Sequence, residues 1–211
     1  MNIIKLLPIA AVAAFGLSES AGAATFGLDT TGGVAATLGA GYDLSEPTMP
    51  HSIVNFSGAG FGGLTVTPGA TITATYMGSE AGASNGARLE FGLFAFSNAT
   101  SSVGDSVTFM NTGNLVNLLF STNNLGGDDA IDNSIGLSTD DRLNMAFTDI
   151  SGATGDVTSV FAFFGDGAGD LDYDDMVIRL DISTVPLPAA GLLLLTGLAG
   201  IGFMSRRRAS A

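Results

Sequence analysis

The chain has 211 residues, a formal net charge of -13 and no cysteine. Charged residues amount to only 13% while glycine occurs 30 times, a composition typical of a glycine-punctuated all-β protein rather than a helical one. The lack of cysteine excludes disulfides, cysteine-ligated zinc and thiol catalysis. The negative charge makes nucleic-acid binding the least favoured function, because DNA and RNA are polyanions.

Residues 1–24 have the order of a secretory signal peptide. Lys5 precedes an apolar run from Leu6 to Leu17, and small residues in an A-x-A-like arrangement follow. This basic, apolar and small-residue order marks segments that are removed on export, and the apolar run is too short to span a bilayer comfortably. We therefore expect an exported protein, cleaved after Ala23 or Ala24.

Residues 25–184 contain a series of short strand signals. Alternating or β-branched segments recur about every ten residues and are bounded by Gly, Pro or Asn, without helical periodicity. Strands are expected at 34–38, 52–56, 63–67, 70–77, 87–96, 106–110, 115–121, 143–149, 157–164 and 176–182. The pattern predicts an all-β domain, a β-sandwich of jelly-roll type, and leaves the strand order open.

Three local patterns give more specific expectations. The threonines of the segment 70–77 alternate with its apolar residues, so we expect their face to be solvated. Asn85-Gly86 is a strong turn dipeptide, and the strand 87–96 that follows has apolar residues on both faces at its far end, which indicates a central strand. The segments 106–110 and 115–121 are expected to form the two arms of a hairpin.

The sequence contains no recognisable catalytic constellation. His51 is the only histidine, so a Ser-His-Asp triad would have to use it, and no G-x-S-x-G motif accompanies it. A glycosidase pair could be drawn from Glu80, Glu90 and many aspartates, but nothing selects two of them at a working separation. We expect that the protein is not an enzyme, and that His51 has a structural or solvated role.

Aspartates are crowded just before the last predicted strand. The segment 163–182 reads FFGDGAGDLDYDDMVIRLDI. Hard cations such as Ca²⁺ take about six to eight oxygen ligands, which alternating carboxylates and the carbonyls of a glycine-rich turn can supply. We expect a Ca²⁺ site because carboxylates this close repel one another unless a cation compensates them. The alternative is that they cap turns and keep the loop soluble. The expected ligands are Asp166, Asp170, Asp172, Asp174 and Asp175.

A second acidic segment spans residues 122–142. A loop of this length is unusual inside a compact domain unless it has a function or is clamped. We expect a solvated loop here, with a metal site as the alternative. Its aspartates are Asp128, Asp129, Asp132, Asp140 and Asp141.

The first acidic segment resembles the end of the DUF4114 domain, in which an aromatic residue, an acidic glycine-rich turn and a hydrophobic strand follow one another. Gly165 stands where that family usually has Glu, and Asp174 where it often has Asn. The resemblance implies an extracellular β domain with a calcium site, in a family of unknown function. It rests on Phe164, Asp166, Gly167, Gly169, Asp170, Asp172, Tyr173, Asp174, Asp175 and Val177.

Residues 185–211 combine a proline motif, an apolar run and a basic end. The motif consists of Val185, Pro186, Leu187, Pro188 and Ala189, and the run that follows ends at Met204. As a helix, residues 187–204 would rise about 27 Å, enough for a single transmembrane helix in a thin bilayer. The basic end consists of Arg206, Arg207 and Arg208, and it favours a cytoplasmic C-terminus with the acidic domain outside.

This three-part tail resembles the VPLPA-type sorting signals of the PEP-CTERM class of Gram-negative bacteria. The resemblance implies that the tail holds a precursor in the inner membrane until an exosortase cleaves near the proline motif. The product would then pass to the cell surface or the extracellular matrix. A plain C-terminal anchor is the alternative.

The sequence therefore predicts a non-catalytic exported surface or matrix protein that is stabilised by Ca²⁺ and processed by an exosortase. A calcium-dependent, lectin-like module that binds an exopolysaccharide is the alternative function. The chain has no Trp and three Tyr, although sugar-binding platforms generally use these residues.

Overall fold

The fold is described for residues 23–39, 41–58, 60, 62–123, 129–134, 137–167 and 173–183 of a computed structural model. Within these ranges all regular secondary structure is β, which confirms the predicted all-β fold. None of the described residues belongs to a helix that could cross a membrane. The predicted signal peptide, apart from its last two residues, and the predicted tail 185–211 lie outside the described ranges.

The described residues contain fourteen strands. In chain order they are β1 (Phe26–Asp29), β2 (Val34–Leu38), β3 (His51–Phe56), β4 (Gly63–Val66), β5 (Thr71–Gly78), β6 (Asn85–Leu89), β7 (Phe94–Ser97), β8 (Ser106–Met110), β9 (Leu118–Thr122), β10 (Asp129–Asp132), β11 (Leu137–Ser138), β12 (Asn144–Thr148), β13 (Ser159–Gly165) and β14 (Met176–Ile182).

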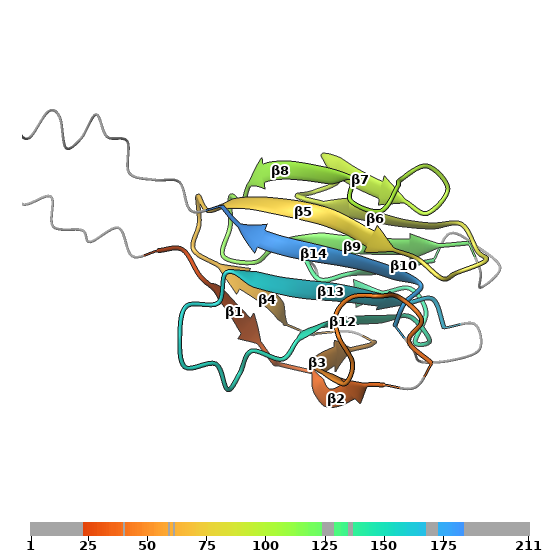
Figure 1. Ribbon diagram of the computed structural model, residues 1–211, viewed down its shortest axis with the longest axis horizontal. Helices are drawn as coiled ribbons and strands as arrows, with labels where there is room; N and C mark the ends of the chain where they lie inside the picture. The colour runs from red at the N-terminus through yellow and green to blue at the C-terminus, as the bar shows by residue number, and fades with distance from the viewer. Residues whose placement is uncertain are drawn as a thin grey trace, which may run out of the picture.

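These strands form two large antiparallel sheets and one small one (Figure 1). The seven-stranded sheet has the order β2-β3-β12-β13-β14-β5-β8, and the five-stranded sheet has the order β11-β10-β9-β6-β7. The remaining pair is β1 with β4. In Figure 1 the seven-stranded sheet lies in front of the five-stranded one, so the architecture is β-sandwich-like.

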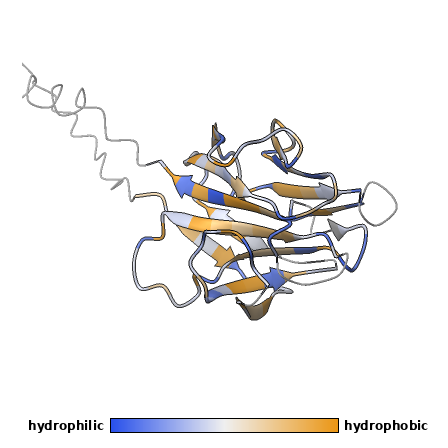
Figure 2. Ribbon diagram, turned by 45° about the vertical axis from the view of Figure 1, so that its right-hand side comes forward, coloured by the Kyte–Doolittle hydropathy of each residue, from blue (hydrophilic) through white to orange (hydrophobic). Residues whose placement is uncertain are grey.

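Aromatic rings join the two large sheets. Phe120 of β9 stacks on Phe164 of β13 with the ring centroids 4.8 Å apart, and Tyr76 of β5 stacks on Phe96 of β7 at 5.9 Å. All four belong to one buried apolar cluster. Figure 2 shows the hydrophobic residues lying mainly along the strands. Burial of this apolar surface is the main favourable term in folding.

The alternation of β5 follows the prediction. Ile72, Ala74 and Tyr76 are buried, whereas the threonines between them are partly exposed. Successive side chains of a strand point to opposite faces of its sheet, so only the apolar set enters the core. Thr73 uses its exposed face to bond Thr108 of the edge strand β8, with the hydroxyl oxygens 2.9 Å apart.

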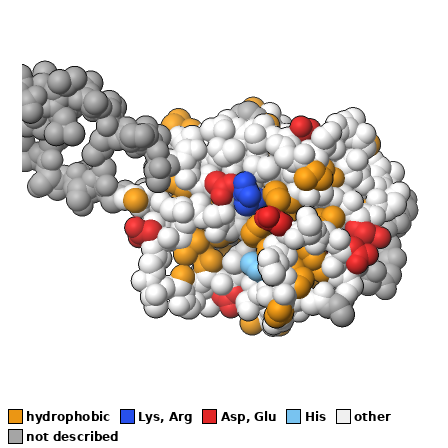
Figure 3. Space-filling view, in the orientation of Figure 1, with side chains coloured by type: hydrophobic (Ala, Val, Ile, Leu, Met, Phe, Trp, Pro, Cys, Tyr) orange, Lys and Arg blue, Asp and Glu red, His pale blue; other side chains and the backbone are white. Residues whose placement is uncertain are grey.

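A second apolar cluster covers part of the outer face of the seven-stranded sheet. Tyr42, from the segment between β2 and β3, packs edge-on against Phe163 of β13 with the ring centroids 6.2 Å apart. Leu44 and Met49 of the same segment pack against this cluster. Figure 3 shows hydrophobic side chains on this face with a few charged ones between them. β13 and β14 are therefore buried on both faces over part of their length.

Several predicted strands are confirmed in position. β2, β8 and β14 have the predicted bounds, and β3, β4, β5, β12 and β13 lie within two residues of theirs. β2 is an edge strand. The prediction that residues 122–142 form a loop is wrong, because this segment contains β10, which pairs with β9 on one side and with β11 on the other.

The predicted turn at Asn85-Gly86 is also wrong, as is the continuous strand 87–96. Asn85 and Gly86 lie inside β6, paired with Thr122 and Ser121 of β9. The chain reverses instead after Glu90, whose buried carboxylate accepts hydrogen bonds from the N–H and the hydroxyl of Thr112. Tertiary contacts thus override the local turn signal.

The predicted hairpin between 106–110 and 115–121 does not form. β8 pairs with β5 in one sheet, and β9 pairs with β6 and β10 in the other. The connection between them bonds the β4 region on its way, because Val66 N–H donates to the Asn114 carbonyl and Val116 N–H to the Leu64 carbonyl. The segment therefore crosses from one sheet to the other.

We predict that replacing Phe120 by Ala destabilises the domain by about 3–5 kcal/mol. The change removes buried apolar atoms, leaves a cavity in the core and removes the stack on Phe164. Urea unfolding of residues 25–184 measures this. Val103→Ala serves as the control, since Val103 is 70% exposed and should change the free energy of unfolding by less than about 0.5 kcal/mol. Equal effects of the two changes would contradict the placement of Phe120 in the core.

Candidate functional site

The acidic turn lies between the last two strands, at one end of the sandwich. β13 ends at Gly165 and β14 begins at Met176, and these strands are hydrogen-bonded neighbours. Figure 1 shows that this end is opposite the one where β14 finishes. All five predicted ligands belong to the connection between these strands, and two of them, Asp170 and Asp172, lie outside the described residues.

The three described aspartates of this turn are buried. Asp174 is 0%, Asp166 4% and Asp175 8% exposed. A buried carboxylate loses its hydration and needs hydrogen bonds or a positive charge in exchange. Backbone groups provide part of these hydrogen bonds. Asp166 N–H donates to Asp175 Oδ2, and Asp43 N–H donates to Asp174 Oδ2, both at 2.6 Å. The first of these bonds closes the two ends of the turn on each other.

Asn85 of β6 brings a distant amide to the same place. Its Nδ2 donates to Asp166 Oδ2 and to the Asp175 carbonyl, each at 3.4 Å. Its Oδ1 is buried and has no hydrogen-bond partner among the described residues. Asn85 could not be predicted at this site, because its sequence context favours a turn and it lies 81 positions from Asp166.

The segment after β5 clamps the turn from another side. The Ser79 hydroxyl donates to the carbonyl of Asp175, and Glu80 N–H donates to the carbonyl of Asp174 at 2.9 Å. The acidic turn is therefore tied to residues of three separate segments, around Asp43, Ser79 and Asn85. Such ties hold carboxylates in place although their charges repel one another.

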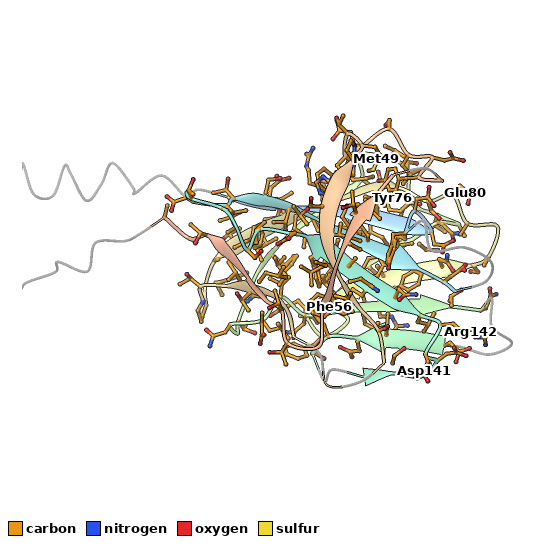
Figure 4. The ribbon with its side chains drawn as sticks, turned by 90° about the horizontal axis from the view of Figure 1, so that it is seen from below. Met49, Phe56, Tyr76, Glu80, Asp141 and Arg142 are labelled. Carbon is orange, nitrogen blue, oxygen red and sulfur yellow. The ribbon has the colours of Figure 1, made fainter. Side chains whose placement is uncertain are left out.

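Two of the described arginines pair with carboxylates outside the acidic turn. Arg142 Nη2 lies 2.7 Å from Asp140 Oδ2, and Arg179 Nε lies 2.9 Å from Asp181 Oδ2. Hydrogen bonds from Arg142 lower the pKa of Asp140 to about 2. Figure 4 shows Arg142 at the same end of the molecule as Glu80.

The negative charge of the acidic turn affects the pKa of Tyr42. Burial is the main cause that raises the pKa of the Tyr42 phenol, and the charges of Asp174 and Glu46 add to it. The phenol donates a hydrogen bond to the Glu46 carbonyl, which requires its neutral form. The neutral Tyr42 side chain therefore lies beside the aspartates without compensating their charge.

The described residues contain no group of three or more His, Cys, Asp or Glu side chains arranged to hold a metal ion. Among the predicted ligands, the structure brings Asp166 and Asp175 together and turns the Asp174 carboxylate towards the Asp43 amide. The oxygen groups that surround the turn, carboxylates with one buried amide oxygen, are those that hard cations prefer.

Three of the described aspartates of the second acidic segment, Asp129, Asp132 and Asp140, accept hydrogen bonds from residues of the same segment. Asp132 Oδ1 accepts the N–H and the hydroxyl of Ser134 at 2.8 and 2.6 Å. Asp129 Oδ1 accepts the Thr139 hydroxyl at 3.1 Å. Asp128 lies outside the described residues.

His51 begins β3 and packs among aromatic residues. Its ring centroid lies 5.6 Å from that of Phe163 and 5.9 Å from that of Phe161, and its Nε2 lies 3.0 Å from Thr148 Oγ1. Burial lowers its pKa. These contacts give His51 a structural role.

Scans against protein-family models, curated proteins and solved structures found no match to this chain.

We predict that Gly167→Ala destabilises the domain by more than about 1 kcal/mol, because alanine is strained at positive φ. Gly167 has a φ of 75°, and a Cβ there would lie 2.6 Å from the Arg142 carbonyl oxygen. Gly155→Ala is the matched control, since its Cβ would meet nothing within 4 Å. Urea unfolding compares the two, and equal stabilities would contradict the described turn.

The stability of the domain should depend on pH through His51, whose pKa is lowered by burial. The folded state favours neutral His51, so below the ordinary histidine pKa of about 6.5 the unfolded chain binds a proton more readily and stability falls. We expect the free energy of unfolding to drop more between pH 7.5 and 5.5 in the wild type than in His51→Gln. Chemical denaturation at both pH values measures this difference. Parallel losses would show that His51 does not contribute.

Proposed function

We propose that the protein is a non-catalytic exported protein of the cell surface or extracellular matrix, with a β domain that Ca²⁺ stabilises at the acidic turn. The observation that carries the calcium proposal is the burial of Asp166, Asp174 and Asp175 at one end of the sandwich. Taking carboxylates out of water costs several kcal/mol per ion after relaxation. A hard divalent cation with oxygen ligands offsets this cost for several carboxylates at once.

Within this proposal, the turn itself supplies the ligands. Asp166, Asp174 and Asp175 hold the ion together with Asp170 and Asp172, and the buried Oδ1 of Asn85 is a further oxygen donor. The ion contributes charge compensation and joins the β13–β14 connection to β6. Its role is structural, because it links segments far apart in the sequence.

Export and sorting are proposed on the flanking segments. Residues 1–24 act as the signal peptide, and residues 185–211 hold the precursor in the inner membrane until an exosortase cleaves near the motif 185–189. β1 begins and β14 ends at the same end of the sandwich (Figure 1), so both flanking segments attach opposite the acidic turn. This arrangement favours a domain whose acidic end points away from the membrane. The assignment of the sandwich to the jelly-roll type stays a prediction.

We predict that millimolar Ca²⁺ raises the melting temperature of residues 25–184 relative to chelator. An ion present at about 100 times its Kd adds about 2.7 kcal/mol, which corresponds to roughly 5–10 °C for a domain of this size. Asp175→Asn should abolish the shift, because it removes a charged ligand and preserves the shape. Differential scanning calorimetry measures it.

Asp181→Asn is the matched control for this experiment. Asp181 lies on β14 and pairs with Arg179, so its variant should keep the full calcium shift. A wild-type domain that melts at one temperature in Ca²⁺ and in chelator would leave the solvated-turn alternative as the better account.

The sorting proposal predicts that replacing Pro186 and Pro188 by alanine stops surface display and leaves the precursor in the inner membrane. Cell fractionation with an antibody to the β domain measures this. Ser183→Ala, just before the motif, is the control and should be sorted normally. Normal surface display of the double variant would contradict exosortase processing at this motif.

A further inference from the structure

A groove crosses the outer face of the five-stranded sheet. Two adjoining cavities of about 240 and 490 Å³ lie on this face and share Arg88 and Leu119 among their lining residues. The first is also lined by Phe91, Asn117 and Asp132, and the second by residues of β6, β7, β9 and β10. The shared residues make the two cavities one continuous depression.

Strand register explains the shape of this groove. Arg88 of β6 lies opposite Leu119 of β9, which lies opposite Asp132 of β10. Two residues further along each strand, Gly86, Ser121 and Ala130 form a second row. Both rows face away from the core, because successive side chains alternate between faces. The row of small residues deepens the groove beside the row of long ones.

A strained turn holds an aromatic ring at this groove. Glu90, Phe91 and Gly92 have φ values of 44°, 56° and 83°, and non-glycine residues in this region cost about 1–3 kcal/mol each. The buried Glu90 carboxylate fixes the turn by accepting the N–H and the hydroxyl of Thr112 at 3.1 and 2.7 Å. Phe91 nevertheless remains 73% exposed. Strained backbone residues cluster at active sites and ligand-binding positions, so a strained turn that exposes a large apolar ring points to a binding site.

The lining of the groove combines apolar surface with hydrogen-bond donors and acceptors. Arg88 donates through five N–H groups, and Asn117 both donates and accepts. Asp132 accepts through its second carboxylate oxygen, since Oδ1 already accepts two hydrogen bonds from Ser134. Arg88 belongs to neither of the two ion pairs among the described residues. A ligand that matches this lining has many hydroxyl groups and apolar ring faces. An apolar peptide would leave the polar groups unpaired, and the net charge of -13 opposes nucleic acid.

We propose that this groove binds an oligosaccharide segment. Arg88, Asn117 and Asp132 bond its hydroxyls, and Phe91 packs on a sugar ring face. The site differs from a calcium-dependent lectin site, because these four side chains do not belong to the acidic turn. The proposal does not rest on calcium binding, although Asn85 both lines the second cavity and bonds Asp166.

The test uses the full chain, purified in a detergent without a sugar headgroup. An array of oligosaccharides from hydrolysed bacterial exopolysaccharides identifies a binder, which is then titrated against the protein in Ca²⁺ and in chelator. We expect binding in both solutions. Arg88→Ala and Phe91→Ala should each weaken it at least tenfold, and Ala130→Leu should weaken it by filling the groove.

Melting temperatures and a matched control separate lost binding from lost folding. Arg88 and Phe91 are exposed, so their variants should melt close to the wild type, and Val103→Ala should bind normally. Absence of any array binder, unchanged affinity in both Arg88→Ala and Phe91→Ala, or binding that disappears in chelator would each overturn the proposal. Binding in chelator without a calcium-dependent melting shift would support the groove and contradict the calcium site.

Discussion

The structure depends on how negative charge is buried where the last two strands are connected. Asp166, Asp174 and Asp175 leave water at this point, in a chain whose acidic residues outnumber its Lys and Arg by 20 to 7. Backbone N–H groups donate to Asp175 and Asp174 and compensate part of this charge. The proposed Ca²⁺ ion would add compensation for several carboxylates at once, because oxygen atoms are the ligands that hard cations prefer.

The position of this turn makes its charge important for the whole domain. β13 and β14 lie in the interior of the seven-stranded sheet and are buried against apolar clusters on both faces. The ties to Asp43, Ser79 and Asn85 extend from the turn to three other segments. Repulsion within the turn would therefore act on two interior strands of the seven-stranded sheet, and relief of this repulsion would stabilise them.

Local alternation was sufficient to predict β5 and β14, because each shows a period of two along most of its length. Alternation gave a wrong prediction at the hairpin between β6 and β7. Phe91 and Leu93 continue the apolar alternation of a strand there, although both are exposed. That turn is set by the bond between Glu90 and Thr112, 22 residues away. The acidic turn could be identified from its spacing, whereas Asn85 could not, because only the tertiary pairing of β6 brings it there.

The acidic turn and the groove on the five-stranded sheet meet at Asn85, which bonds Asp166 and lines the second cavity. A crystal structure of the β domain grown with Ca²⁺ tests the central claim most directly. The account predicts one ion with oxygen ligands of Asp166, Asp174 and Asp175 at about 2.3–2.6 Å. Carboxylates at this turn that are ordered by protein groups and water alone, with no ion among them, would contradict it.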